Sequence, residues 1–145
     1  MLLSILIKKS GTKMSINFGN NEILLDDNSM IVTETNEKGI ITFASKDFCK
    51  IAGYTKEELI GQPHNFIRHS FMPSSAFKDL WDTVKSGRIW TGVVINATKN
   101  GGYYWVRATV YPSKTETGAI KYISVRVKAS KEGILDATAL YPTIK

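Results

Sequence analysis

The chain has 145 residues with a net charge of +6, and 43% of its residues are hydrophobic. This length fits one domain with short extensions, and no apolar run is long enough to cross a bilayer. The basic residues are spread without a basic run or a nucleic-acid-binding motif, which argues against a nucleic-acid partner. Cys49 is the single cysteine, so an internal disulfide is excluded and a reducing cytoplasm suits the chain. We expect a cytoplasmic protein that reaches a membrane only through a partner, without direct insertion.

Residues 1–28 are predicted to form an N-terminal arm or cap. They contain several glycines and asparagines, and one apolar cluster at Ile23-Leu24-Leu25 that can dock as a turn. The lysines near the start follow the hydrophobic residues and no small-residue cleavage site comes after them, which is not the pattern of a secretory signal. Regular structure is expected to begin after this arm.

Two β-strands are predicted next, at 30–35 and 40–44. Both runs are rich in β-branched residues. The segment Asn36-Glu37-Lys38-Gly39 between them carries a glycine where a tight turn needs one. The pattern therefore predicts a β-hairpin.

Two short helices should follow the hairpin. Ser45 can cap the first, and Gly53 ends it. Thr55 and Glu58 have the spacing of a capping box, which predicts the start of the second near residue 56 and its end near Gly61.

A longer helix is predicted after Pro73, capped by Ser74 or Ser75 and ending near Gly87. Its apolar residues recur at helical spacing, so we expect Phe77 and Trp81 to be core residues.

The apolar pattern then changes to a period of two, which predicts antiparallel strands at 90–97, 103–111 and 119–128. Residues 131–140 can form a short amphipathic helix that Pro142 does not continue. Strands and helices grouped in this way indicate an α+β domain in which short helices cover one face of an antiparallel sheet of about five strands. We expect the domain at 29–129 and a C-terminal linker or short helix at 130–145.

The connector 61–73 stands out from this framework, because it holds both histidines of the chain and two of its four prolines. Pro63 and Pro73 disfavour a long helix between them. Irregular, polar connectors on a rigid scaffold often carry binding residues.

Several segments of the chain resemble the PAS domain family in their order and spacing. These segments are residues 36–41, Phe48, 53–62 and 99–106. Within the family, the connector with Ala76, Phe77 and Trp81 is similar to the FAD-binding sensor domain of bacterial aerotaxis, or energy-taxis, receptors. The resemblance implies a PAS fold and non-covalently bound FAD that acts as a redox reporter.

Two positions depart from related patterns. In light-oxygen-voltage PAS domains a photoreactive cysteine matches His64 and a glutamine matches Arg68, so the resemblance implies no photoadduct chemistry. In aerotaxis receptors an acidic residue usually occupies the position of Phe71. The chain therefore resembles a sensor of electron supply, not of light.

Four connector residues are candidate cofactor contacts: His64, Asn65, Arg68 and His69. Arg68 and His69 are suited to a diphosphate or to the electron-rich edge of a reduced flavin, although solvated surface residues would also fit the sequence alone. The two histidines can instead ligate haem, which is the second choice of cofactor.

Three strand residues complete the candidate site. Alternation places Trp90 and Asn96 on one strand face, where an apolar wall with one amide suits a flavin ring. Asn96 also matches the flavin-contacting position of flavin-binding PAS domains. If the resemblance sets the faces correctly, Arg126 points into the cavity as a fixed cation, and an exposed strand-end arginine is the alternative.

The opposite face of the last strand carries an apolar stripe, Ile123, Val125 and Val127. We expect the N-terminal arm, a second subunit or a signalling partner to cover it. The resemblance implies a methyl-accepting chemotaxis transducer, or its HAMP or signalling region, as partner, and a PAS homodimer is a further expectation.

The function predicted from these features is redox and energy-taxis sensing by an FAD-binding PAS domain. A cofactor-free PAS interaction or dimerisation module and a haem-binding gas sensor are the alternatives. The sequence contains no nucleophile–base pair, metal-ligand spacing or phosphate-binding loop. We therefore expect no catalytic residue, no metal site and no enzyme activity.

Overall fold

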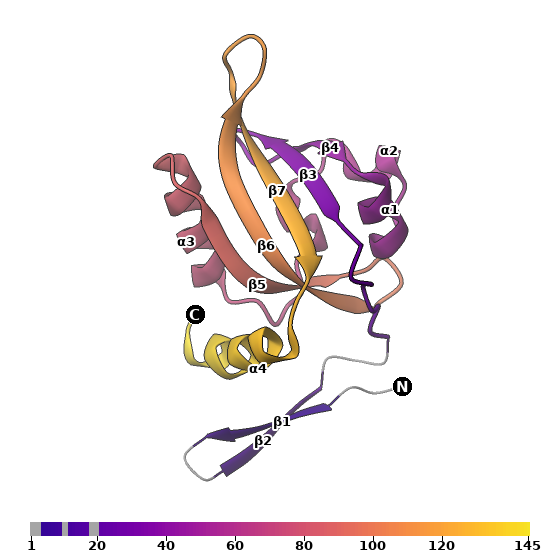
Figure 1. Cartoon of the computed structure of the whole chain (residues 1–145), viewed down its shortest axis with the longest axis vertical. Helices are drawn as coiled ribbons and strands as arrows, with labels where there is room; N and C mark the ends of the chain where they lie inside the picture. The colour runs from indigo at the N-terminus through magenta and orange to yellow at the C-terminus, as the bar shows by residue number, and fades with distance from the viewer. Residues whose placement is uncertain (1–3, 10–11, 18–20) are drawn as a thin grey trace.

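The computed structural model describes residues 4–9, 12–17 and 21–145. Its main feature is a five-stranded antiparallel sheet with strand order β4-β3-β7-β6-β5 (Figure 1). The strands are β3 (Ile31–Asn36), β4 (Ile41–Ala44), β5 (Trp90–Ala97), β6 (Tyr103–Lys114) and β7 (Ile120–Lys128). The predicted strands and the α+β class are confirmed.

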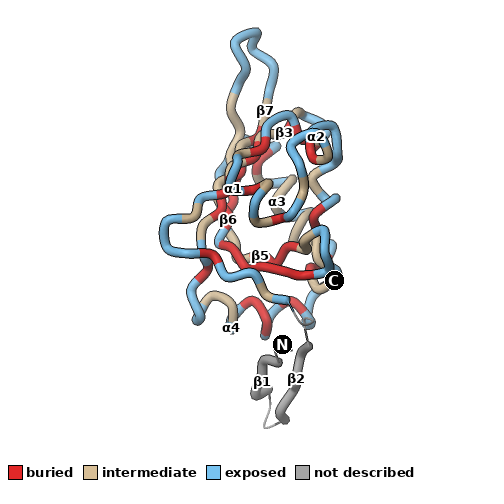
Figure 2. Tube along the Cα trace, turned by 90° about the vertical axis from the view of Figure 1, so that its right-hand side faces the viewer, coloured by how far each residue is buried: buried red, intermediate tan, exposed pale blue. Residues whose placement is uncertain are grey.

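One face of this sheet is covered by short helices and by the connector. They are α1 (Lys46–Ala52), α2 (Lys56–Leu59), the 3₁₀ helix η1 (His64–Ile67) and α3 (Ser74–Lys85). The α1 and α2 helices lie beside β3 and β4, and α3 lies beside β5 and β6. Buried residues run along β5 and the lower parts of β6 and β7, whereas the tip of the β6–β7 hairpin is exposed (Figure 2).

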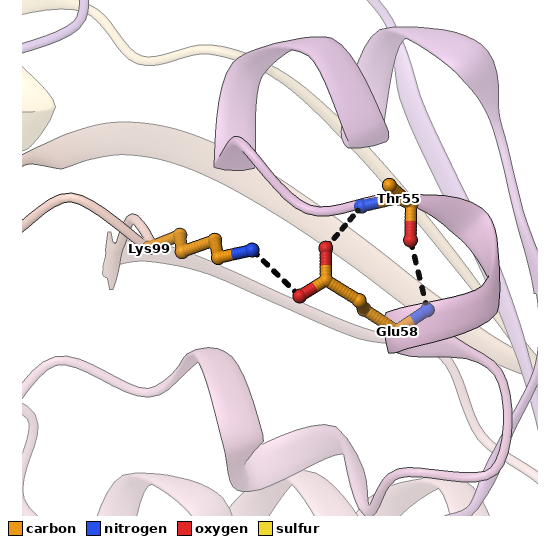
Figure 3. A network of polar contacts seen from close by, with 3 residues as sticks. All are labelled: Thr55, Glu58 and Lys99. Carbon is orange, nitrogen blue, oxygen red and sulfur yellow. Dashed lines mark hydrogen bonds and ion pairs between the residues drawn. The ribbon is translucent and has the colours of Figure 1, made fainter.

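The predicted helix caps of α1 and α2 are confirmed. The Ser45 side chain accepts a hydrogen bond from the backbone N–H of Phe48, and Gly53 ends α1 in the left-handed conformation at φ 82°. In the α2 capping box, the Glu58 N–H donates to Thr55 Oγ1 at 3.1 Å and the Thr55 N–H donates to Glu58 Oε1 at 3.0 Å (Figure 3).

Lys99, in the β5–β6 loop, extends this capping network. Its Nζ lies 2.7 Å from Glu58 Oε2, so the loop and α2 are held together (Figure 3). The hydrogen bond from Lys99 lowers the pKa of Glu58.

The predicted serine cap of α3 is wrong. Pro73 is the N-cap residue, without a side-chain hydrogen bond, and the helix already begins at Ser74. The N–H of Ser75 instead donates to the backbone carbonyl of Lys145 at 2.8 Å. A carbonyl from the far end of the described chain thus takes the role that a local hydroxyl was expected to fill.

The predicted C-terminal helix is confirmed as α4 (Lys131–Leu140), and the 3₁₀ helix η2 (Tyr141–Thr143) continues from it. It packs against β5, where the Tyr141 hydroxyl donates to the Val93 carbonyl. A Cβ added at Gly133 would lie 3.2 Å from Val93 Cγ2, so the two elements approach closely.

The expectation that regular structure begins only after residue 28 is wrong. The backbone forms an antiparallel hairpin of β1 (Ser4–Lys9) and β2 (Thr12–Asn17), and β1 lies beside α4. The arm prediction for residues 1–3, 10–11 and 18–20 lies outside the described residues. Residues 21–25 do dock as expected, because the Ile23 N–H donates to the Tyr103 carbonyl at 2.8 Å and Leu25 is buried.

The division of the chain at residues 28 and 129 stays a prediction. Within the described ranges, none of the helices has both the length and the apolar character needed to span a membrane.

Candidate cofactor cavity

A cavity of about 320 Å³ lies between the sheet and the elements that cover it. Strands β3, β5, β6 and β7 form its floor, and α3, the connector and the β3–β4 turn form the remaining walls. Of the residues predicted to contact a cofactor, the lining includes His64, Asn65, Arg68, Trp90, Asn96 and Arg126. Residues distant in the sequence are therefore brought to one cavity.

Arg126, on β7, is the buried cation of this cavity, with 1% of its surface exposed. Its Nη2 donates to Thr33 Oγ1 at 2.9 Å, and its guanidinium lies 4.8 Å from the Phe48 ring centroid. Its Nε and Nη1 are buried and have no hydrogen-bond partner among the described residues. Burial lowers the pKa of Arg126, but arginine remains charged in proteins. Arg126 thus lines the cavity, on the face that the family resemblance implied.

His64, at the start of η1, shares Thr33 with Arg126. Its Nε2 lies 3.2 Å from Thr33 Oγ1, and its backbone N–H donates to the Gly39 carbonyl. Burial, and secondarily the positive charge of Arg126, lowers the pKa of His64 from 6.5 to about 3. The imidazole is therefore neutral at physiological pH.

Asn96, on β5, adds a buried amide, with 5% of the residue exposed. Its Nδ2 makes no hydrogen bond of normal geometry within the described residues, but the Asn96 side chain interacts with the Tyr104 hydroxyl, where it opposes the rise in pKa that burial causes. An isolated antiparallel bridge between Arg68 and Asn96 holds the connector against β5. The cavity thus presents a second buried donor besides Arg126.

Trp90 forms an apolar wall at the other end of β5, and its indole Nε1–H donates to Asp79 Oδ2 at 2.9 Å. Arg68 is half-buried, donates from Nη2 to the Met72 carbonyl at 3.1 Å and lies over the Phe77 ring at 4.4 Å. Asn65 is exposed at the rim.

His69 is not brought into the cavity. Its Nδ1 accepts a hydrogen bond from the Phe71 N–H at 3.0 Å, and its ring packs edge-on against Tyr103 at 6.1 Å between centroids. The backbone is extended at Arg68, which bridges to Asn96, and of these two neighbours Arg68 lines the cavity and His69 does not. The two histidines therefore do not converge on one ligand.

Phe77 and Trp81 were expected in the core, and both pack against it, but they are half-buried and also line the cavity. Trp81 packs edge-on against Tyr122 at 5.4 Å between ring centroids, and a Cβ added at Gly39 would lie 3.4 Å from Trp81 Cζ2. Helical periodicity identifies the inward face of α3 but cannot distinguish packed core from cavity wall. Thr33 was not singled out either, because nothing local marks it as the shared partner of His64 and Arg126.

Charged groups from separate elements lie toward the rim. Glu37 and Lys38 belong to the β3–β4 turn, and Lys85 is the last residue of α3. Among the described residues, no ion pair is formed by either of these two lysines.

Ile123, Val125 and Val127 lie on the outer face of β7 and are half-buried. What covers them stays a prediction. Among the described residues, no group of three or more potential ligands could hold a metal ion.

The cavity belongs to a fold with many solved relatives. The light-state LOV domain of the blue-light photoreceptor Aureochrome1 superposes with a TM-score of 0.63 at 17% identity, covering 81% of this chain and 93% of that chain. A fungal LOV-domain photoreceptor has a TM-score of 0.61 at 21% identity, covering 72% and 77% respectively. The predicted fold is confirmed by these likenesses.

Sequence comparison agrees. The chain is 43% identical over 124 residues to the aerotaxis receptor of Escherichia coli K12, covering 86% of this chain and 24% of the receptor. It is 25% identical over 99 residues to the nitrogen fixation regulatory protein of Klebsiella pneumoniae, covering 68% and 20%. The chain thus spans about a quarter or less of these relatives' lengths. A PAS domain family model matches residues 27–126. The predicted resemblance is therefore confirmed, and the chain belongs to the PAS domain family.

Proposed function

We propose that the cavity binds the flavin ring of FAD and that the chain is a redox sensor for energy taxis. The observation that carries this proposal is Arg126, a buried cation with two nitrogens that lack a partner among the described residues. Leaving such donors unpaired costs stability, so a ligand with acceptor atoms is favoured. The pyrimidine edge of a flavin offers such acceptors, and the Asn96 amide supplies a further donor.

The charges in the cavity suit a ligand that becomes more electron-rich. His64 and Arg126 both bond the Thr33 hydroxyl. Because His64 is neutral, Arg126 supplies the positive charge of this network. Bound FAD would supply a redox centre whose charge changes with electron supply. Arg126 would stabilise the reduced form, and Trp90 and Trp81 would exclude water from the ring.

The rim suits the phosphate end of the ligand. Lys38 and Lys85 approach it from different elements, and Glu37 offsets part of their charge. We propose His64, Asn65, Arg68, Trp90, Asn96 and Arg126 as cofactor contacts, with Trp81 added to them. His69 is left out because it packs against Tyr103.

The signal would pass to a chemotaxis transducer or its HAMP or signalling region, in the cytoplasm, without turnover of a substrate. This part of the proposal is supported by the similarity to the aerotaxis receptor of E. coli. The unit that senses is residues 29–129, between the N-terminal cap and the C-terminal helix. The outer stripe Ile123, Val125 and Val127 is the surface we propose for the transducer or for a PAS homodimer.

An absorption spectrum of the purified protein before and after dithionite tests the cofactor. We expect flavin absorption that bleaches on reduction, and FAD in the supernatant after heating. Colourless protein that takes up no flavin would remove the cofactor from the proposal. A haem Soret band would replace the redox sensor with a gas sensor.

A cofactor-free interaction module is the second candidate, and the half-buried stripe on β7 is the feature that favours it. It predicts that Trp90→Ala leaves partner binding intact in protein without flavin. Arg126 counts against it, because an empty cavity would leave the buried Nε and Nη1 of the guanidinium without acceptors from the described residues.

A further inference from the structure

Trp90 borders two hollows of the molecule. One is the proposed cofactor cavity, and the other is a cleft of about 850 Å³ between α3, β5 and α4. β5 is an edge strand of the sheet, so this cleft lies at the sheet edge beside α4. The indole is therefore a partition between an inner cavity and an outer cleft.

Two residues hold the indole in this place. Asp79, on α3, accepts the indole N–H through Oδ2 at 2.9 Å. Gly92, two residues along β5, leaves the space that the ring occupies, because an added Cβ would lie 2.4 Å from Trp90 Cη2 and 2.7 Å from Cζ2. Real Cβ atoms do not approach other atoms so closely, so any larger residue at position 92 must displace the ring.

The hydrogen bond acts on the N–H of the indole, and the glycine leaves room for its six-membered ring. Trp90 is only 8% exposed, so its N–H would be costly to bury without an acceptor. The carboxylate of Asp79 is a charged acceptor, which makes the bond stronger than a neutral one. Without the Asp79 carboxylate the indole would be free to turn, and a larger residue at position 92 would push it aside. Either change would join the cavity to the cleft.

We propose that Asp79 and Gly92 are positioning residues that lock Trp90 as a closed wall, and that this lock sets how long a ligand stays in the cavity. Neither residue needs to touch the ligand. The retention part rests on the proposed function, because it takes flavin as the ligand, whereas the lock itself is a property of the protein alone.

Exchange of the indole N–H with solvent tests the lock in flavin-free protein. The three tryptophans each give an indole resonance in a ¹⁵N–¹H NMR spectrum, and Trp90→Phe identifies the one from Trp90. We expect Asp79→Leu to speed exchange at Trp90 by about tenfold or more, and Asp79→Asn, which keeps an oxygen acceptor, to restore much of the protection. Trp81 and Trp105 serve as internal references for the fold.

Asp82→Leu is the matched control. Asp82 lies on the same helix and pairs with Lys78 at the surface, so its replacement should leave the Trp90 resonance unchanged. Unchanged exchange at Trp90 in Asp79→Leu, or equal acceleration in Asp82→Leu, would overturn the lock.

Flavin release tests the consequence. After dilution of loaded protein, recovery of free-flavin fluorescence should be about tenfold faster in Asp79→Leu and Gly92→Ala than in the wild type or Asp82→Leu. The double variant Gly92→Ala/Trp90→Phe removes the clash with the larger ring, so it should release flavin more slowly than Gly92→Ala alone. Wild-type release rates in both single variants would overturn the retention role.

The two proposals fail separately. Protein that never binds flavin removes the proposed function, yet the exchange experiment still confirms or refutes the lock. Protein that binds flavin but shows no effect at Asp79 or Gly92 retains the function and refutes the lock.

Discussion

The capping network of Thr55, Glu58 and Lys99 and the cavity network of Thr33, His64 and Arg126 differ in how completely the protein satisfies them. In the first, which lies at the surface, the reciprocal backbone bonds and the lysine all find partners inside the protein (Figure 3). In the second, where Thr33 and Arg126 are buried and His64 is half-buried, two guanidinium nitrogens have no partner among the described residues. The completed network holds α2 in place, whereas the incomplete one is suited to a partner from outside the chain.

Arg126→Met, which removes the buried cation of the incomplete network, should have the largest effect on FAD binding. Two charge-assisted hydrogen bonds to the ligand, each contributing about 1.5–3 kcal/mol, would be lost, so FAD affinity should fall by at least about 100-fold. The free energy of unfolding of the flavin-free variant should equal or exceed that of the flavin-free wild type, because the substitution removes a buried cation that has no counterion. Fluorescence titration and urea unfolding measure the two quantities. Arg107→Met, at an exposed site on β6, is the control, and retained FAD affinity in Arg126→Met would contradict the role of the cation.

The pH dependence of stability is the second test of the buried network. Between pH 6.5 and about 3 the unfolded chain binds a proton at His64 that the folded chain does not. The contribution of neutral His64 to the free energy of unfolding is therefore complete above pH 6.5. It is lost as the pH falls through this window, by up to about 1.4 kcal/mol per pH unit.

In urea unfolding across this pH window, the free energy of unfolding should fall more steeply with decreasing pH in the flavin-free wild type than in His64→Gln. Burial also lowers the pKa of the half-buried His69. His69→Gln should therefore also make this fall less steep, but by a smaller amount than His64→Gln. Equal slopes for the wild type and His64→Gln would show that His64 is not held neutral by the fold.

Asn96→Leu should have a smaller effect on binding. Loss of one neutral hydrogen bond should weaken FAD binding by about tenfold, while the flavin-free protein keeps or gains stability because a buried amide that lacks a hydrogen bond of normal geometry within the described residues disappears. Fluorescence titration and thermal unfolding by circular dichroism provide the two readouts. A variant that binds FAD as well as the wild type would place the amide outside the contact.

Thr55→Ala should give the smallest effect, and only on folding. Loss of the N-cap should lower the free energy of unfolding by about 1 kcal/mol, with FAD affinity unchanged. Urea unfolding and flavin titration of the same preparation check both points. A large loss of FAD binding in this variant would mean that the surface network also shapes the cavity.

Local chemistry decided which parts of this molecule were predictable from sequence. Ser45, Gly53 and the Thr55–Glu58 pair act within a few residues of themselves, so their caps are as predicted. Strand alternation placed Trp90 and Asn96 on the cavity face for the same reason.

Features that depend on distant partners were not predictable. The start of α3 is completed by the carbonyl of Lys145, and nothing near Ser75 signals this. His69 and Arg68 are neighbours, yet only Arg68 lines the cavity, where its backbone bridges to the distant Asn96. Trp81 packs against the core and also forms a wall of the cavity, and this second position depends on where α3 rests on the sheet, which helical periodicity does not encode.

The low pKa of His64 determines how the charge of the cavity depends on pH. An imidazole that stays neutral down to about pH 3 has the same charge throughout the near-neutral pH range. A shift of pH within that range would therefore leave the charges of the Thr33, His64 and Arg126 network unchanged. Any pH dependence of the proposed flavin site near neutrality would then come from the ligand and not from His64.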